Sequence, residues 1–314
     1  MKIVSVEPIG ISKEKAQEIA AEMAALGHEF VCYPDRKEDA ETLRERMKDA
    51  EIVIISNIPL KAEVLSACPK LRFLSVAFTG LDHIDQEYCK EHGIRIQNAA
   101  GYATRAVGEL AIGLALDVFR RITVLDAQTR CSGTRANFLG RELYGKTFGL
   151  VGTGAIGTHT ARLAQAFGCR VIAWNRSEHE EIRRMGIPYL SLAEVVRQSD
   201  VLSLHVPLTA ETKHLISKEM LALCKPTAIL VNTARGNVVD MDALAEALKE
   251  GRLAGVGLDV YEKEPPLPEN HALLTAPNVV LLPHVGYATR EAFDIRIGIM
   301  LDNIRNYLRE AANA

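Results

Sequence analysis

The chain has 314 residues, 48% of them hydrophobic and 25% charged, and its formal net charge is −3. This length suits two ordinary domains. Without a basic block, binding to nucleic acid or to an anionic membrane surface is not expected. The amino-terminal residues lack the apolar core of a signal peptide, and no apolar run reaches about 18 residues, so we expect a cytoplasmic protein. The six cysteines are scattered without C-x-x-C or metal-ligand spacing, which indicates reduced thiols without a catalytic role.

Short apolar runs rich in Val and Ile alternate along the chain with longer runs of helical period. This alternation is typical of parallel sheets joined by crossover helices, so the predicted fold class is α/β with two doubly wound domains. A helix is expected over residues 13–26, within a smaller, flavodoxin-like domain. The strands expected in that domain span residues 3–6, 29–32, 52–56, 73–76 and 94–97.

A long apolar segment, residues 107–125, is expected to form one buried helix that leads to a second domain. Six strands, the number in a complete Rossmann dinucleotide-binding domain, are predicted there. They span residues 147–151, 170–174, 201–205, 228–231, 254–258 and 279–282. A last helix, residues 291–309, is expected to return to the first domain. The expected division is residues 1–98 and 288–314 for a discontinuous substrate domain, and 99–287 for the dinucleotide-binding domain.

The pattern G-x-G-x-x-G, formed by Gly152, Gly154 and Gly157, lies where a predicted strand turns into a helix. Gly152 suits the tight turn, Gly154 the approach of backbone to a pyrophosphate, and Gly157 the packing of helix on strand. The N–H groups at the helix start, including those of Ala155 and Ile156, would face the anion. Three glycines at this spacing can also form a mere loop, but the strand-to-helix context favours a dinucleotide site.

The second strand of such a domain usually ends in an acid that binds the adenosine ribose and repels a 2′-phosphate. Asn175 stands there in this chain, followed by Arg176 and Ser177, a cation and a hydroxyl that could hold the phosphate of NADP(H). Two alternatives remain. Ser177 with Glu180 matches a helix capping box, and Arg176 could be an ordinary surface side chain among glutamates that weaken a phosphate site. The missing acid and the added cation favour NADP(H) over NAD(H).

Arg235, the two acids Asp259 and Glu264, and His284 each follow one of the last three predicted strands. Ligands bind at the carboxyl ends of the strands in open α/β sheets. An arginine, a carboxylate and a histidine are therefore expected to converge near the cofactor, with both acids as candidate partners of His284.

At these residues the chain resembles the D-isomer-specific 2-hydroxyacid dehydrogenases, over nearly its full length. The matching segments include A-F-T-G-L-D-H-I-D at residues 77–85, the glycine pattern, H-V-P-L at residues 205–208, and the segments after the last three strands. The resemblance implies NAD(P)H-dependent reduction of a small 2-keto acid to the D-2-hydroxy acid, or the reverse. Glyoxylate, hydroxypyruvate and pyruvate-like compounds are the implied substrate class.

Carried over position by position, Arg235, Glu264 and His284 match the family's catalytic residues. The implied substrate-binding residues are Phe78, Thr79, Gly80 and Arg235, with backbone groups of the loop helping to hold the substrate carboxylate. The implied cofactor-binding residues are Thr104, Gly152, Gly154, Ala155, Ile156, Gly157, Asn175, Arg176, Ser177, His205, Val206, Pro207, Thr212, Thr233, Ala234, Asp259, His284 and Gly286. Tyr287 departs from the family, in which a smaller residue is frequent there, so the shape of the pocket is open.

These residue types suit the implied reaction. Reduction of a 2-keto acid brings a hydride to the carbonyl carbon and a proton to its oxygen, on which negative charge develops. A protonated His284 gives that proton and takes it back in the reverse direction, and the carboxylate of Glu264 favours and orients the imidazolium. The planar guanidinium of Arg235 grips the substrate carboxylate and polarises the carbonyl better than lysine would.

Other interpretations stay open. His83 and His205 are expected to be packing or loop residues, and no metal site is expected. A nucleotide-sensing protein like the corepressors of this fold could keep the same residues without turnover. Formate or phosphite oxidation is a further alternative, although formate dehydrogenases usually place Gln before the histidine, where this chain has Leu282-Pro283. The family dimerises through the region of the linking helix, so a homodimer is expected.

Overall fold

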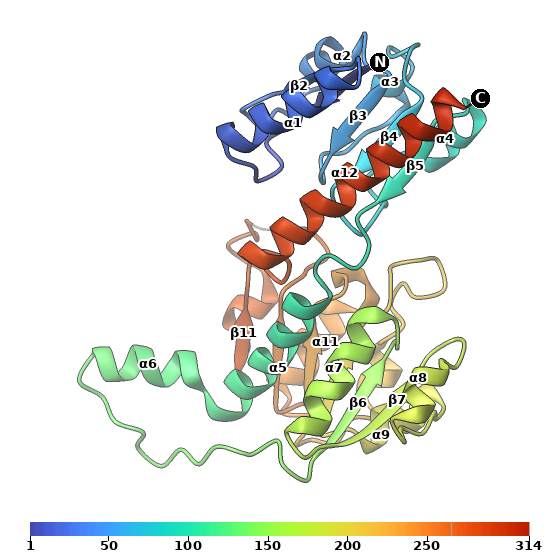
Figure 1. The fold of residues 1–314 in the computed structure, drawn as a ribbon. Helices are drawn as coiled ribbons and strands as arrows, with labels where there is room; N and C mark the ends of the chain where they lie inside the picture. The colour runs from blue at the N-terminus through green and yellow to red at the C-terminus, as the bar shows by residue number, and fades with distance from the viewer. Residues whose placement is uncertain (265, 314) are drawn as a thin grey trace. The chain divides into compact units, whose positions relative to one another are not determined.

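Figure 1 shows the computed structural model of the chain, which describes residues 1–264 and 266–313. The chain divides into two compact units, one of Met1–Tyr102 with Thr289–Ala314 and the other of Ala103–Ala288. Each unit is built around its own parallel sheet, which confirms the predicted α/β class. Among the described residues, no helix has both the length and the apolar character needed to cross a membrane.

The first unit has a five-stranded parallel sheet in the order β2-β1-β3-β4-β5, which is the flavodoxin-like order. Each strand begins and ends within one residue of its predicted position. The central strands β3 and β4 are fully buried and leave largely apolar runs in the sequence, whereas the edge strands β2 and β5 are only partly buried. The strands are β1 (Lys2–Ser5), β2 (Glu29–Cys32), β3 (Ile52–Ile55), β4 (Phe73–Val76) and β5 (Arg95–Asn98).

Helix α12 (Arg290–Ala312) packs against the sheet of the first unit, although it lies at the far end of the sequence (Figure 1). The Tyr307 ring stacks on Phe73 of β4, with centroids 4.4 Å apart, and the Asn303 side chain donates to the Asn98 carbonyl over 3.0 Å. These contacts tie α12 to the two strands at one edge of the sheet. The other helices of this unit are α1 (Lys13–Ala25), α2 (Ala40–Met47), α3 (Ala62–Leu65) and α4 (Gln86–Glu91).

The second unit has a six-stranded parallel sheet in the order β11-β10-β9-β8-β6-β7. Tyr189 adds a parallel bridge to Ala173 of β7. If this bridge is counted as the third strand, the order is that of a Rossmann sheet with one further strand, and the switch point lies between β6 and β8. The strands are β6 (Thr147–Val151), β7 (Arg170–Trp174), β8 (Val201–Leu204), β9 (Ile229–Asn232), β10 (Gly255–Leu258) and β11 (Val279–Leu281).

The predicted single helix over residues 107–125 is wrong. Helix α5 (Thr104–Arg120) ends before Arg121, whose φ of 50° is left-handed, and α6 (Ile122–Arg130) starts after it. The Asp117 carboxylate caps the new start by accepting from the backbone N–H of Thr123 over 3.0 Å. The apolar pattern runs past this break, so it could not reveal it.

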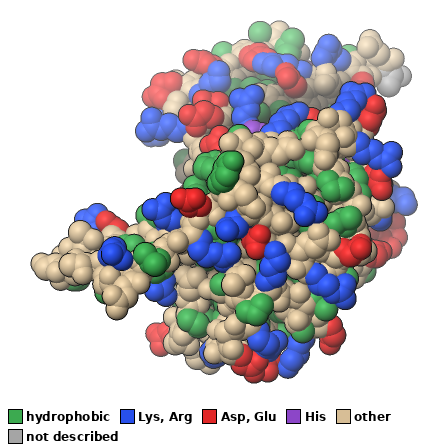
Figure 2. Space-filling model, turned by 90° about the horizontal axis from the view of Figure 1, so that it is seen from below, with side chains coloured by type: hydrophobic (Ala, Val, Ile, Leu, Met, Phe, Trp, Pro, Cys, Tyr) green, Lys and Arg blue, Asp and Glu red, His purple; other side chains and the backbone are tan. Residues whose placement is uncertain are grey.

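The two helices differ in burial. Helix α5 buries one face against α7 (Ala155–Ala166) and the neighbouring strands, whereas α6 has no buried residue. Together with the segment after it, α6 projects from the body of the second unit (Figures 1 and 2). On the face shown in Figure 2, basic and acidic side chains are interspersed. The apolar character of α5 is therefore used for packing within the chain.

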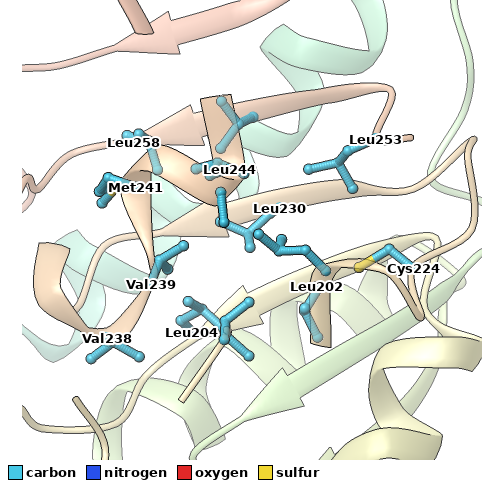
Figure 3. Packing of buried hydrophobic residues seen from close by; sticks show 14 of the residues in the cluster. Leu202, Leu204, Cys224, Leu230, Val238, Val239, Met241, Leu244, Leu253 and Leu258 are labelled. Carbon is cyan, nitrogen blue, oxygen red and sulfur yellow. The ribbon is translucent and has the colours of Figure 1, made fainter. Parts of the chain in front are cut away.

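One core cluster of the second unit lies between the sheet and α11 (Met241–Lys249). Leu202, Leu230 and Leu258, from three strands, gather with Met241 and Leu244 of the helix (Figure 3). The carboxyl ends of β9 and β10 lead to Arg235 and to Asp259 and Glu264, so a packed core fixes the position of these strands. The remaining helical segments are α8 (Glu180–Arg184), α9 (Leu192–Gln198), α10 (Lys218–Leu221), η1 (Gly236–Val238) and η2 (Ala272–Thr275).

Candidate active site

The glycine-rich turn joins β6 to α7 at the switch point of the second sheet. Gly152 has a φ of 103°, and a Cβ there would lie 2.7 Å from the carbonyl of His205. A Cβ on Gly157 would lie 2.2 Å from the Gly152 oxygen, so the turn and the first turn of α7 are in close contact. At Gly154, by contrast, a Cβ would meet nothing within 4 Å. Two glycines thus serve close packing, and the third borders open space at the helix start, where Ala155 and Ile156 follow.

The segment after β8 closes one side of this turn. The His205 N–H donates to the Val151 carbonyl over 2.7 Å, and its Nε2 lies 2.9 Å from the Ser203 hydroxyl. Burial lowers the pKa of His205 to about 4, so the ring is neutral at physiological pH. The Thr212 hydroxyl donates to the Pro207 carbonyl over 2.6 Å, which closes the loop that follows, and Val206 is buried in the core.

Asn175 follows β7 and braces the turn with its side chain. Its Oδ1 accepts from the Thr153 N–H over 3.3 Å, and its Nδ2 donates to the Ser177 carbonyl over 2.7 Å. The Thr153 hydroxyl lies 2.9 Å from Tyr189 OH, which also accepts from the His179 N–H. The second-strand position thus carries a neutral amide that connects two loops, where an acid would repel a phosphate.

The capping-box alternative for Ser177 is wrong. Helix α8 begins at Glu180 with His179 as its N-cap, and Ser177 lies outside the helix. Arg176 and Ser177 are both exposed. The hydrogen bond from Thr209 lowers the pKa of Glu211, and the charge of Arg176 contributes to this, so Arg176 lies near the loop after β8.

The three glutamates near Arg176 are each paired with a different arginine: Glu178 with Arg183, Glu180 with Arg184, and Glu181 with Arg162. These pairings reduce the local repulsion that the glutamates would exert on a phosphate.

The segment after β9 is ordered by Asn232. Its side chain donates to the Arg235 carbonyl over 2.9 Å and accepts from the Ala234 N–H over 3.0 Å. Thr233, which lies between Asn232 and Ala234 in the chain, is only 8% exposed, and its hydroxyl has no hydrogen-bond partner within the described residues. A buried hydroxyl without a partner is costly, and a bound ligand could satisfy it.

Arg235 is held close to the segment after β10. A Cβ on Gly236 would lie 1.9 Å from the Tyr261 carbonyl carbon, and the Asn237 side chain donates to the Glu262 carbonyl over 3.4 Å. Only glycine permits this approach of the two backbones. The Arg235 Nη1 donates to the Ala234 carbonyl over 2.8 Å.

His284 follows β11 in an unusual conformation. Its φ of 56° is left-handed, which costs a non-glycine residue about 1–3 kcal/mol unless its surroundings impose it. The carboxylate of Asp259 imposes it here, because one oxygen accepts from the Val285 N–H and the other from the Gly286 N–H, both over 2.7 Å. Asp259 is 1% exposed, and burial raises its pKa against the opposing effect of the two N–H groups.

The carboxylate paired with His284 is that of Glu264. The Nδ1 atom of His284 lies 3.2 Å from Oε2 of Glu264. The ring also contacts Tyr287 edge-on, with centroids 5.7 Å apart. Of the two candidate acids, Glu264 therefore holds the imidazole and Asp259 holds the backbone that carries it. Sequence reasoning missed the second pair of this kind, His271 Nε2 with Glu262 Oε1 at 2.9 Å.

The predicted substrate loop lies in the first unit, after β4. The Phe78 carbonyl accepts from the Ala99 N–H over 3.0 Å, and the Thr79 carbonyl accepts from the Asn98 side chain over 2.7 Å. In a trans peptide the N–H points opposite to the carbonyl. The N–H groups of Thr79 and Gly80 therefore face away from these donors, and in the part of the chain that the structure describes they donate to no acceptor.

Phe78, the first residue of the loop, is 7% exposed, and its ring lies 6.4 Å from that of Tyr102. Asn98, which sequence reasoning missed, could have been found by the argument applied to Arg235, since it is a polar residue at a strand end.

The structure brings the remaining predicted cofactor residues of the second unit to the carboxyl edge of its sheet, except Thr104, which lies at the start of α5.

All six cysteines are free thiols, and burial raises the pKa of Cys68, Cys89, Cys169 and Cys224 to about 11. Among the described residues, no cluster of His, Cys, Asp or Glu could hold a metal ion.

The residues around the glycine turn fit a dinucleotide. The turn is tightly packed from behind and open at Gly154, and the α7 N-terminus offers N–H groups toward an anion. The Thr233 hydroxyl supplies a buried polar group that lacks a partner. Arg176 is an exposed cation in the segment after β7.

Comparison with known proteins places this geometry in a family. Residues 112–286 match the family model described as D-isomer specific 2-hydroxyacid dehydrogenase, NAD binding domain. The glyoxylate reductase of Thermococcus litoralis is 42% identical over 82% of this chain and 80% of its own length. The structure of acyclic imino acid reductase Bsp5 with NADPH and D-Arg has a TM-score of 0.88 at 29% identity, over 99% of this chain and 98% of that one.

The structure of a glyoxylate reductase from Paecilomyes thermophila has a TM-score of 0.87 at 32% identity, over 97% of this chain and 94% of that chain. These relatives do not favour the corepressor-like or formate-type alternatives. The chain belongs to the D-isomer specific 2-hydroxyacid dehydrogenase family.

Proposed function

We propose that this enzyme, a D-2-hydroxyacid dehydrogenase that reduces 2-keto acids with NAD(P)H, acts on small 2-keto acids of the glyoxylate, hydroxypyruvate and pyruvate class. The observation that carries the proposal is the His284–Glu264 pair, held in a left-handed turn at the edge of the sheet that carries the glycine turn. The names of the relatives support the substrate class. Absorbance at 340 nm with a panel of 2-keto acids tests it, and a panel without turnover would refute it.

The chemistry follows from the side chains. A bound reduced nicotinamide supplies the hydride. With Nδ1 directed to Glu264, Nε2 of His284 is the nitrogen that delivers a proton to the substrate oxygen and recovers it in the reverse direction. Arg235 binds the substrate carboxylate and polarises the carbonyl. The outward N–H groups of Thr79 and Gly80 are assigned to substrate binding by the first unit.

We assign the two units distinct roles. The unit Ala103–Ala288 binds the cofactor, and this is supported by the family model, which lies within it. The discontinuous unit presents residues 78–80 and binds substrate. Thr104, Asp259 and Gly286 are assigned to the nicotinamide half, and the loop at residues 205–212 to the cofactor as well. The cytoplasm is the proposed location, since the buried thiols fit a reducing compartment.

NADP(H) is the proposed preferred cofactor, because an amide and a cation replace the usual acid after β7. Arg176→Ala is expected to raise KM for NADPH by about 10-fold, with little change in KM for NADH, since a charge-assisted bond to the 2′-phosphate is lost. Arg170→Ala is the matched control, because it removes an exposed arginine at the opposite, amino end of the same strand β7. A wild-type enzyme that prefers NADH would contradict the assignment of Arg176.

A homodimer is proposed through α6 and the segment after it. Ile122 is 54% exposed, Val124 41% and Leu139 81%, although all three are apolar. Ile122 and Val124 belong to α6, which projects from the second unit (Figure 1). A second copy of this chain would remove these exposed apolar side chains from water. Light scattering at micromolar concentration is expected to give twice the chain mass of 34.5 kDa. A monomer mass would refute the dimer.

A further inference from the structure

The substrate loop has a third carbonyl that is held from within the first unit. The Ala77 carbonyl accepts from Nη1 of Arg296 over 3.4 Å, and the carbonyls of the next two residues are held by Ala99 and Asn98. The oxygens of three successive peptide groups are thus each hydrogen-bonded to a donor elsewhere in the first unit. Because each N–H is opposite to its carbonyl, the Ala77 carbonyl sets the direction of the Phe78 N–H, and the next two carbonyls set those of the Thr79 and Gly80 N–H groups. Arg296 thus holds the first peptide group of the loop, from which the two substrate-facing groups follow directly.

Arg296 is the charged residue among these donors, and it is 4% exposed. Its Nη2 donates to the Ile9 carbonyl over 2.6 Å, so one guanidinium joins the loop after β1 to the end of β4. The guanidinium carbon lies 4.3 Å from the centroid of the Phe293 ring and 5.8 Å from that of Tyr102. These contacts fix the planar group in one orientation.

We propose that Arg296 is a positioning residue for substrate binding, which holds the loop of residues 77–80 so that its N–H groups meet the substrate carboxylate. The proposal rests on the function proposed above for this loop. The short charge-assisted bond to the Ile9 carbonyl anchors the guanidinium, and its longer bond to the Ala77 carbonyl then restrains the first peptide group of the loop. An aliphatic side chain at this site would leave the Ala77 and Ile9 carbonyls buried without this donor.

The kinetic test compares Arg296→Met and Arg296→Lys with a matched control, Arg46→Met. Arg46 is also a buried arginine of the first unit, 8% exposed, which donates to the Val6 carbonyl over 2.6 Å and lies over the Tyr33 ring. Arg296→Met is expected to raise KM for glyoxylate by about 10-fold or more, with kcat and the Kd for NADPH nearly unchanged. Arg296→Lys should bring KM for glyoxylate part of the way back toward the wild-type value. Arg46→Met should lower the stability of the protein and leave its KM unchanged.

An unchanged KM in Arg296→Met, or an equal rise in Arg46→Met, would overturn the proposal. If the methionine variant does not fold, the lysine variant decides the question, because it must still raise KM above that of the wild type. The urea midpoint of each variant separates loss of stability from loss of substrate binding.

Hydrogen exchange gives a readout without substrate. The Ala99 amide donates to the Phe78 carbonyl, so its exchange reports the orientation of the loop. It is expected to exchange about 10-fold faster in Arg296→Met and at the wild-type rate in Arg46→Met. An unchanged rate would overturn the positioning role. A wild-type enzyme inactive on every 2-keto acid would instead refute the proposed function, while the exchange result would still test what Arg296 does to the loop.

Discussion

His284→Ala is expected to lower kcat by about 10²–10⁴-fold, with the Kd for NADPH little changed. The reason is that the imidazole is the group that exchanges a proton with the substrate oxygen, and alanine has no such proton. Single-turnover absorbance at 340 nm measures the chemical step, and quenching of protein fluorescence measures cofactor binding. Retention of near wild-type turnover would show that another group is the acid.

The second histidine pair supplies the control for this experiment. His271 lies 2.9 Å from Glu262, is in the same unit, and resembles the His284–Glu264 pair in chemistry. His271→Ala is expected to change kcat by less than about 3-fold, because the His271 side chain caps the short helix η2. If His271→Ala removed turnover and His284→Ala did not, His271 would be the acid–base residue and the assignment of His284 would be wrong.

The sequence predicts the strands of both sheets within one residue. The central strands, such as β3, β8 and β9, are fully buried and leave short apolar runs, which makes them the clearest signals. Backbone conformation leaves no such trace. Neither the left-handed residue that separates α5 from α6 nor the left-handed conformation of His284 follows from apolar periodicity. Both are fixed by carboxylates, Asp117 in one case and Asp259 in the other, whose partners depend on the folded backbone.

Side-chain pairing was harder to predict than the location of the site. Motif order places Arg235, Glu264 and His284 at one sheet edge, since strands β9, β10 and β11 are neighbours. It does not distinguish which acid bonds the imidazole and which bonds the backbone, because Asp259 and Glu264 follow the same strand. Hydrogen bonds between distant segments, such as that from Arg296 to Ala77, have no local sequence signal at all.

Substitutions in the glycine turn are expected to separate folding from cofactor binding. Gly154→Ala should leave the Tm of the cofactor-free protein unchanged within about 2 °C, because the added methyl meets nothing within 4 Å. It should raise the Kd for NADPH by about 10-fold or more, since the methyl occupies the space that the pyrophosphate needs beside the backbone. Gly157→Ala should destabilise the protein itself by about 3 kcal/mol, because its methyl overlaps the Gly152 carbonyl.

Gly113→Ala is the control for both substitutions, because it adds a methyl in α5 that also meets nothing within 4 Å. It is expected to leave the Kd for NADPH unchanged and to raise stability by up to about 1 kcal/mol, as alanine is the better helix residue. Tight binding of NADPH by Gly154→Ala would mean that no pyrophosphate approaches that backbone, and the glycine turn would then be a structural loop. Equal loss of binding in Gly113→Ala would point to a general effect of the substitutions, because that position lies on the exposed face of α5.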